Sequence, residues 1–200
     1  MRRNPAVTGL ARGLSILGHP LVVMPGAGLA AWVARGGGTA QAAGIAVGSG
    51  LAGLLILGYS RWRVRSGAWA HVDASGRGER RNLNRFLLAA FAGGAVAGWA
   101  LAWPPAVTLA LVLGAAMVAA ALLTARWCKA SLHMAFAVFA AGLLHAVSAW
   151  AVAAALLMTL AIAWSRLHLQ RHVSADLWCG AAIGVVAAIA FNGLPGILPP

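Results

Sequence analysis

The residues with the clearest chemical potential are His172 and Asp176, four positions apart at the start of an apolar segment. On a helix, this spacing places both side chains on one face. A carboxylate that accepts one ring N–H fixes the histidine tautomer and leaves the other ring nitrogen free for nucleophilic attack. Arg166 adds a planar, permanently charged fork that suits phosphate oxygens. The structural alternative is a juxtamembrane arginine that follows a helix-capping serine, Ser165.

A second polar cluster, Lys129 to His133, begins another apolar segment. The first turn of a helix has unpaired backbone N–H groups and the positive end of the helix dipole, so it favours an anion. Ser131 would either cap this helix or bind phosphate. His133 is placed to donate a proton to a leaving oxygen, because imidazole gains and loses a proton near physiological pH. Taken alone, His133 is better explained as a structural histidine at the membrane interface.

The third cluster is the arginine-rich segment from His71 to Arg85. Arg77, Arg81 and Arg85 follow one another at four-residue steps, so they would line one stripe of a helix. We expect Arg77 and Arg81 to hold phosphate oxygens. A solvated basic loop or a patch that binds anionic lipids explains these arginines equally well.

These clusters must be positioned by a chain of 200 residues that is 62% hydrophobic and only 9% charged. So little polar surface excludes a water-soluble globule of this size. A chain in lipid must satisfy its own backbone hydrogen bonds, which predicts an all-α fold: a polytopic transmembrane bundle of six or seven helices. A span takes about 20 apolar residues. Suitable runs lie near residues 14–34, 40–60, 86–103, 105–125, 131–149, 151–165 and 174–193, within a single domain over residues 1–200.

This threading brings the three polar clusters to one membrane face, because two helices separate each cluster from the next. It also brings 14 of the 15 cations there, all except Arg35, and all three acids. By the positive-inside rule this face is cytoplasmic, and we expect a multi-pass protein of a bacterial inner membrane. Because the arginines punctuate apolar segments and form no single basic tract, the net charge of +12 does not indicate nucleic-acid binding.

The composition also bears on metals and redox chemistry. Cys128 and Cys179 have a spacing that fits neither a zinc site nor a disulfide framework, so we expect two packing thiols. Three acids are too few for a carboxylate-rich magnesium cage. The sequence therefore predicts chemistry that uses no metal and no cofactor.

A resemblance becomes specific at this point. Ser165, Arg166, His172 and Asp176 fit the Ser-Arg-x5-His-x3-Asp motif of the type 2 phosphatidic acid phosphatase superfamily, and the chain resembles a bacterial membrane-bound member of it. The similarity covers about residues 71–180. His19-Pro20 also resembles a feature of some bacterial members.

The two other motifs of that superfamily are matched in part or not at all. Ser131 and His133 resemble its Pro-Ser-Gly-His motif, although Ala130 replaces the proline and Leu132 replaces the glycine. The first motif, Lys-x6-Arg-Pro, has no counterpart, because Lys129 is the only lysine in the chain. Arg77 and Arg81 would have to replace its two basic residues.

The resemblance implies a role for each site residue. His172 would attack phosphorus to form a phosphohistidine, Asp176 would orient it, and His133 would protonate the departing alcohol. Arg166, Ser131 and Ser165, with the loop arginines, would bind the phosphate. The implied activity is metal-independent hydrolysis of a lipid-linked phosphate monoester or pyrophosphate, of the phosphatidic acid, phosphatidylglycerol phosphate or polyprenyl phosphate class. A lipid phosphotransferase on the same scaffold and a non-catalytic protein that binds or transports anionic lipids are the alternatives.

Overall fold

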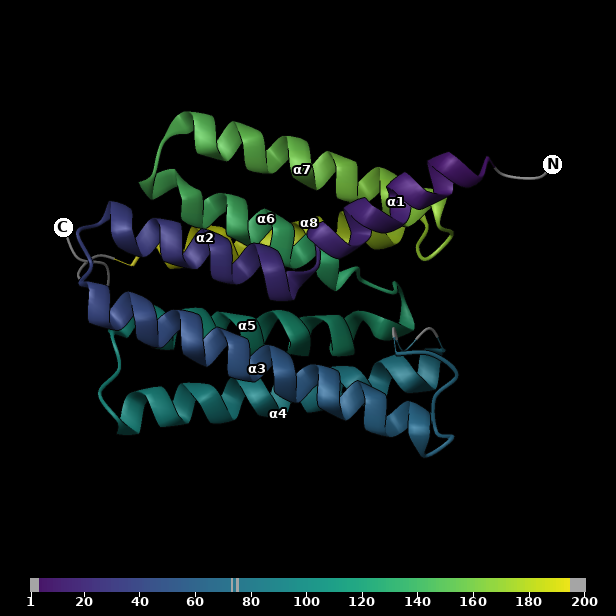
Figure 1. The fold of residues 1–200 in the computed structure, drawn as a ribbon, viewed down its shortest axis with the longest axis horizontal. Coiled ribbons are helices and arrows are strands. Elements are labelled where there is room, and N and C mark those ends of the chain that lie inside the picture. The colour runs from purple at the N-terminus through teal and green to yellow at the C-terminus, as the bar shows by residue number, and fades with distance from the viewer. Residues whose placement is uncertain (1–3, 73, 75, 195–200) are drawn as a thin grey trace.

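The described part of the chain is built from helices, as the sequence predicts. The computed structural model describes residues 4–72, 74 and 76–194, and no strand occurs among them. Eight α-helices run lengthwise in one bundle (Figure 1). They are α1 (Pro5–Leu17), α2 (Pro20–Ala34), α3 (Thr39–Arg65), α4 (Arg77–Ala100), α5 (Pro105–Leu123), α6 (Leu132–Leu143), α7 (Ala149–His168) and α8 (Ser174–Asn192).

Five of these helices are long and apolar enough to cross a membrane, and α1 with α2 makes a sixth span if the bent pair counts as one. The predicted transmembrane helical bundle is therefore confirmed. The prediction of one unbroken helix over 14–34 is wrong, because α1 and α2 meet at a 49° bend. Pro20 causes the break: its ring disfavours helical geometry in the preceding residue, and His19 is extended, with φ −67° and ψ 139°.

The helix bounds also differ from the apolar runs at the polar face. Helix α4 begins at Arg77, nine residues before the predicted start at 86, so the arginines of the third cluster lie on a helix. Glu79 stabilises this start by accepting hydrogen bonds from the backbone N–H groups of Ala70 (2.8 Å) and Gly76 (3.0 Å). An apolar run marks where a helix can cross hydrocarbon, whereas charged residues can continue the same helix into water.

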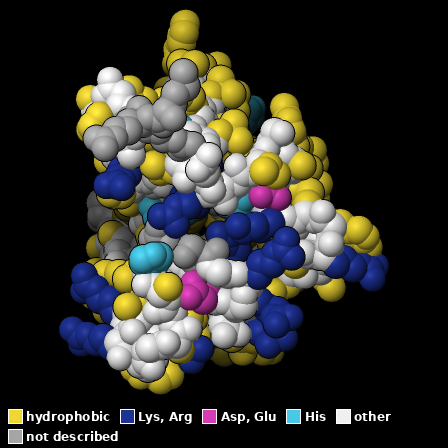
Figure 2. Space-filling view, turned by 90° about the vertical axis from the view of Figure 1, so that its right-hand side faces the viewer, with side chains coloured by type: hydrophobic (Ala, Val, Ile, Leu, Met, Phe, Trp, Pro, Cys, Tyr) yellow, Lys and Arg dark blue, Asp and Glu magenta, His cyan; other side chains and the backbone are white. Residues whose placement is uncertain are grey.

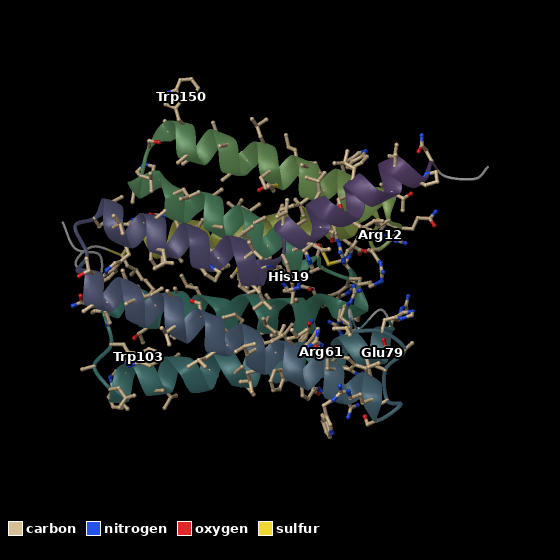
Figure 3. All side chains as sticks on the ribbon, in the orientation of Figure 1. Arg12, His19, Arg61, Glu79, Trp103 and Trp150 are labelled. Atoms are coloured by element: carbon tan, nitrogen blue, oxygen red, sulfur yellow. A yellow bond between two sulfur atoms is a disulfide. The ribbon has the colours of Figure 1, made fainter. Side chains whose placement is uncertain are left out.

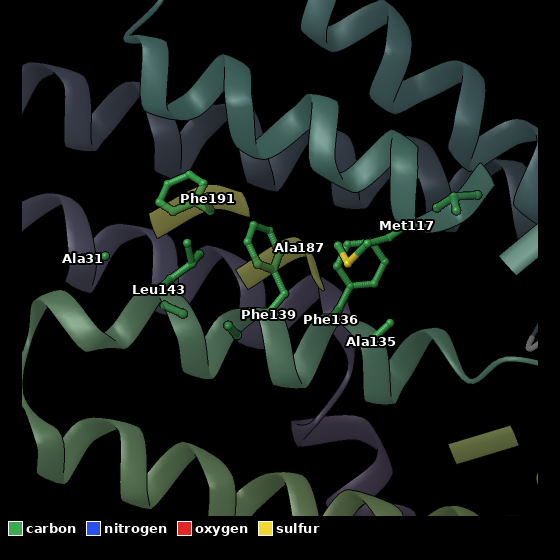
Figure 4. Packing of buried hydrophobic residues seen from close by; sticks show 11 residues of the cluster. Ala31, Met117, Ala135, Phe136, Phe139, Leu143, Ala187 and Phe191 are labelled. Atoms are coloured by element: carbon green, nitrogen blue, oxygen red, sulfur yellow. The ribbon is translucent and has the colours of Figure 1, made fainter. Parts of the chain in front are cut away.

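Helix α6 is the centre of the bundle and is shorter than the predicted segment 131–149. It packs against α2, α5, α7 and α8, and eight of its 12 residues are buried. Phe136 and Phe139 fill the core against Met117 of α5 and Phe191 of α8 (Figure 4). At 12 residues α6 would extend about 18 Å, so it owes its place to these neighbours and not to its own length.

The contact between α6 and α8 depends on glycine. A Cβ on Gly180 would collide with the carbonyl oxygen of Ser131, and one on Gly184 would collide with that of Ala135. Glycines four residues apart let two membrane helices approach with their backbones almost in contact. The pair therefore brings the start of α8, with His172 and Asp176 beside it, against the start of α6.

A disulfide bond between Cys128 and Cys179 joins the same two places. The prediction of two packing thiols is wrong. The two cysteines are 51 residues apart in sequence, and they meet because α8 packs closely against α6. Their spacing alone therefore does not predict the pair.

The charged residues gather at one end of the bundle. In Figure 3, Arg12, Arg61 and Glu79 lie toward one end, and Trp103 and Trp150 lie at the other. Figure 2 views the charged end, where Lys and Arg side chains surround a smaller number of acidic and histidine side chains. The hairpins thus return the polar clusters to a shared face.

Candidate functional site

Asp176 connects two of the predicted clusters. One of its oxygens, Oδ2, lies 3.2 Å from Nδ1 of His172, and the other, Oδ1, accepts a hydrogen bond from the Lys129 backbone N–H at 3.0 Å. The Ser131 backbone N–H donates to the Asp176 carbonyl oxygen, also at 3.0 Å. The start of α8 is therefore fixed to the segment that precedes α6. This geometry places His172, Asp176 and Ser131 in one site.

His172 is buried beside Asp176, which contacts its Nδ1. The other ring nitrogen, Nε2, is the one that could act as a nucleophile. Burial and, after it, the charges of Arg80 and Arg166 together lower the pKa of His172 to about 4, against the opposing hydrogen bond and charge of Asp176. The ring is thus neutral at physiological pH. A neutral ring whose Nδ1–H is held by a carboxylate presents a lone pair on Nε2, as a nucleophile requires.

Arg166 and Ser165 are positioned by α1, a contact that the sequence did not suggest. The Ser165 hydroxyl donates to the Ala11 carbonyl oxygen at 2.7 Å, and Nη1 of Arg166 donates to the Ser15 hydroxyl at 2.9 Å. Both residues of α7 are buried. The Ser165 hydroxyl proton is therefore used in a hydrogen bond between α7 and α1. Ser15 orients the guanidinium of Arg166. No pattern in residues 5–17 marks Ser15 as part of a site.

Ser131 stands at the start of α6 with its side chain completely buried. Its hydroxyl has no hydrogen-bond partner among the described residues, and the same holds for Nη1 of Arg80. Buried polar atoms are nearly always paired, so an unpaired hydroxyl and an unpaired guanidinium nitrogen in one charged site fit an oxyanion ligand. Ser131 therefore fits the predicted phosphate-binding role.

His133 lies on the first turn of α6 and faces a second histidine from α2. The rings of His133 and His19 meet edge to face, with their centroids 5.0 Å apart. Nδ1 of His19 accepts the Leu21 backbone N–H at 3.2 Å, so its ring proton, when neutral, is on Nε2. We did not predict His19 as a site residue. Its position before Pro20, at a forced helix start, is the signal that could have revealed it.

The arginines of α4 differ in how far they are buried. Arg77, Arg81 and Arg85, the predicted stripe, are exposed, although the charge of Arg77 still acts on Lys129. Arg80 and Asn84 are on the face that packs inward, and Arg80 interacts electrostatically with Asp176 and His172. Arg80 is therefore the arginine of α4 that lies partly buried near His172 and Asp176. Four-residue periodicity found a helix face, but only the packing of α4 shows which face is inward.

Lys129 completes the cationic ring of the site. Burial lowers the pKa of Lys129, and the nearby charges of Arg80, Arg77 and Arg166 add to this effect against the attraction of Asp176. Its ammonium group lies 3.5 Å from the Arg171 carbonyl oxygen. The charges of three arginines thus act on Lys129 beside the carboxylate of Asp176. Such a site favours a ligand with two negative charges.

The described residues contain no group of three or more His, Cys, Asp or Glu side chains that could hold a metal ion. The chemistry offered by this site is instead a neutral histidine, an orienting carboxylate, a second histidine and several guanidinium groups. This set suits transfer of a phosphoryl group.

Known proteins give no further guide. No family model matches this chain, and neither a curated protein nor a solved structure matches it at a significant level.

Proposed function

We propose that this membrane protein is a metal-independent phosphatase that hydrolyses a lipid-linked phosphate or pyrophosphate through a phosphohistidine. The observation that carries the proposal is the His172–Asp176 pair at 3.2 Å, beside the unpaired Ser131 hydroxyl and within the fields of Arg80 and Arg166. The fit to the Ser-Arg-x5-His-x3-Asp motif supports the same chemistry.

In the first step, Nε2 of His172 attacks phosphorus as the bond to the lipid oxygen breaks. His133 enters this step in its protonated form and gives its extra proton to that oxygen, so the lipid leaves as a neutral alcohol and His133 becomes neutral. Water then attacks the phosphohistidine and passes its proton to His133, which releases inorganic phosphate and restores both rings. Arg80, Arg166 and Ser131 stabilise the charge on the equatorial oxygens during both transfers.

The decisive experiment measures phosphate release in the presence of EDTA, by purified protein in detergent, from phosphatidic acid, phosphatidylglycerol phosphate and a polyprenyl phosphate. We expect EDTA-resistant release that is lost in His172→Ala and kept in His145→Ala, since His145 is exposed and lies on the turn after α6. Phosphate transfer to added glycerol without release to water would identify a phosphotransferase. Binding of these lipids with neither reaction would identify a non-catalytic lipid-binding protein.

We further propose that the site faces the cytoplasm across a bacterial inner membrane, because the threading of the sequence puts 14 of the 15 cations on the site's side of the membrane. A cysteine at Gly78, which has open space around it, should resist a membrane-impermeant maleimide in intact cells, while one at Thr39 should react. The Cys128–Cys179 disulfide at the same face favours the opposite orientation, because disulfides persist in oxidising compartments. Labelling of the Gly78 cysteine would therefore place the site on the outer side of the membrane and overturn the cytoplasmic proposal.

A further inference from the structure

An apolar cavity of about 260 Å³ lies between α2, α6 and α7. Helix α6 runs between the other two helices, both of which pack against it (Figure 1). Small residues such as Gly26, Ala137 and Ala155 line the cavity and leave room between the helices. Gly26 is exposed, so the cavity opens sideways at α2. We call this space the α2–α7 groove.

On each of the three helices, the groove begins about one turn from a residue of the candidate site. On α2, Val23 and Gly26 follow His19 by four and seven residues. On α6, Ala137, Ala140 and the following Leu144 are four, seven and 11 residues after His133. Such spacings keep residues on one helix face.

Helix α7 runs in the opposite direction and shows the same relation. Ile162, Thr159 and Ala155 precede Arg166 by four, seven and 11 residues. Each helix therefore puts one polar site residue a single turn away from the first residue of the groove. The groove therefore begins about one helical turn from the site residues His19, His133 and Arg166.

The chemistry of the walls selects the occupant. Thr159 supplies the one hydroxyl among the lining side chains, and that hydroxyl donates to the Ala155 carbonyl oxygen of its own helix at 2.8 Å. The walls thus offer methyl, methylene and thioether contacts and leave no side-chain donor unsatisfied. A hydrocarbon chain fits such walls, and a polar group would lose its hydrogen bonds there.

The dimensions fit one chain. From His133 to Leu144, 11 residues of helical rise give about 16 Å, close to the ~15 Å of hydrocarbon in one bilayer leaflet. The volume of about 260 Å³ is less than twice the ~150 Å³ cavity that holds benzene in an engineered protein. A second chain of the same lipid would remain in the bilayer, outside the opening at Gly26.

We infer that the α2–α7 groove binds one hydrocarbon chain of the lipid whose phosphate lies against His172, His133 and Arg166. The inference rests on the proposed phosphatase and adds the binding site for the lipid chain. It predicts that activity rises with the length of one hydrocarbon chain up to about one leaflet. Further chain length, or a second chain, should have little effect.

The first test compares dodecyl phosphate with butyl phosphate in two matched variants. A Cβ at Gly26 or at Gly28 meets nothing within 4 Å, but only Gly26 lines the groove. Gly26→Leu should lower the ratio of kcat/KM for dodecyl phosphate to that for butyl phosphate about tenfold, as expected when roughly two methylene groups lose their contacts. Gly28→Leu should leave the ratio unchanged. An unchanged ratio in Gly26→Leu, or an equal fall in both variants, would overturn the inference.

The second test does not need turnover. Dodecyl phosphate with a diazirine at the chain end is photolysed with His172→Ala, and the labelled residues are mapped by mass spectrometry. We expect labels on the part of α6 after Ala140 and on the facing part of α7 before Thr159. Labels there in a protein whose wild type releases no phosphate would disprove the phosphatase and keep the chain site. Labels only on outer surfaces such as α3, in an active enzyme, would keep the phosphatase and disprove the groove.

Discussion

The α6–α8 junction and the α3–α4 side of the bundle contribute to the same charged face by different means. At the junction, the Gly180 contact, the Cys128–Cys179 disulfide and the hydrogen bonds of Asp176 hold the start of α8, just after His172, against the segment that leads into α6. On the other side, α3 has none of its 18-residue apolar window buried inside the bundle, and three arginines of α4 point outward. The comparison teaches that the proposed covalent chemistry sits where two helix starts are held together, while exposed arginines of the α3–α4 side add charge around it.

The largest effect should come from breaking the junction's central pair with Asp176→Asn. An amide cannot hold the His172 Nδ1–H as a carboxylate does, and the wrong ring tautomer would then be favoured. We expect kcat/KM for lipid phosphate to fall about 10³-fold or more, as in other sites where a carboxylate orients a catalytic histidine. A loss below about tenfold would mean that the pair is structural.

Two neighbouring arginines test how far the α3–α4 side contributes to the proposed reaction. Arg80→Gln should lower kcat/KM about 10- to 100-fold, because Arg80 is turned toward Asp176 and His172 and would stabilise charge in the transition state. Arg81→Gln, one residue away on the exposed face, should change it less than about threefold. Equal losses in the two variants would mean that α4 acts only through its net charge.

The Gly180 contact can be compared with Gly78 on α4, where an added Cβ would meet nothing within 4 Å. Gly180→Ala forces a Cβ against the Ser131 carbonyl oxygen, so we expect a loss of about 1–3 kcal/mol in unfolding free energy together with reduced activity. Gly78→Ala meets open space on α4 and should leave stability unchanged or raise it by about 0.5–1 kcal/mol. Chemical denaturation in one detergent would measure both. Equal stability of the two variants would contradict the close α6–α8 packing.

The smallest effect is a shift in the pH profile. The nucleophile must be unprotonated, so kcat/KM should fall on the acid side as the pH approaches about 4, where His172 gains a proton. Arg80 is one of the charges that lower this pKa, so the acid limb should move to higher pH in Arg80→Gln and stay in place in Arg81→Gln. If the acid limbs of the wild type and Arg80→Gln coincide, the charge of Arg80 does not act on His172.

Much of the architecture followed from composition and local spacing. Apolar runs of span length gave the helical bundle, and the even number of helices between polar clusters gave their shared face. The four-residue step from His172 to Asp176 gave a pair that the structure holds at 3.2 Å. These features are local, or depend on the bilayer acting as a uniform solvent, so a single sequence is sufficient to infer them.

Other features arise only when distant segments meet. The break at His19 was readable in principle from Pro20, but the meeting of His19 with His133 required α2 to pack on α6. Ser15 reaches Arg166 only because α1 folds back along α7.

The sequence by itself thus determined that this chain lives in a membrane, that its helices return their polar ends to one face, and that a histidine–carboxylate pair lies there. Tertiary packing alone decided that Arg80 and not Arg81 turns inward, that the two cysteines pair, and that an apolar groove lies about one helical turn from the site. The physical reason is the range of the interactions. Hydropathy and helical spacing act over a few residues, whereas inward faces, disulfides and cavities depend on which helix surfaces come into contact.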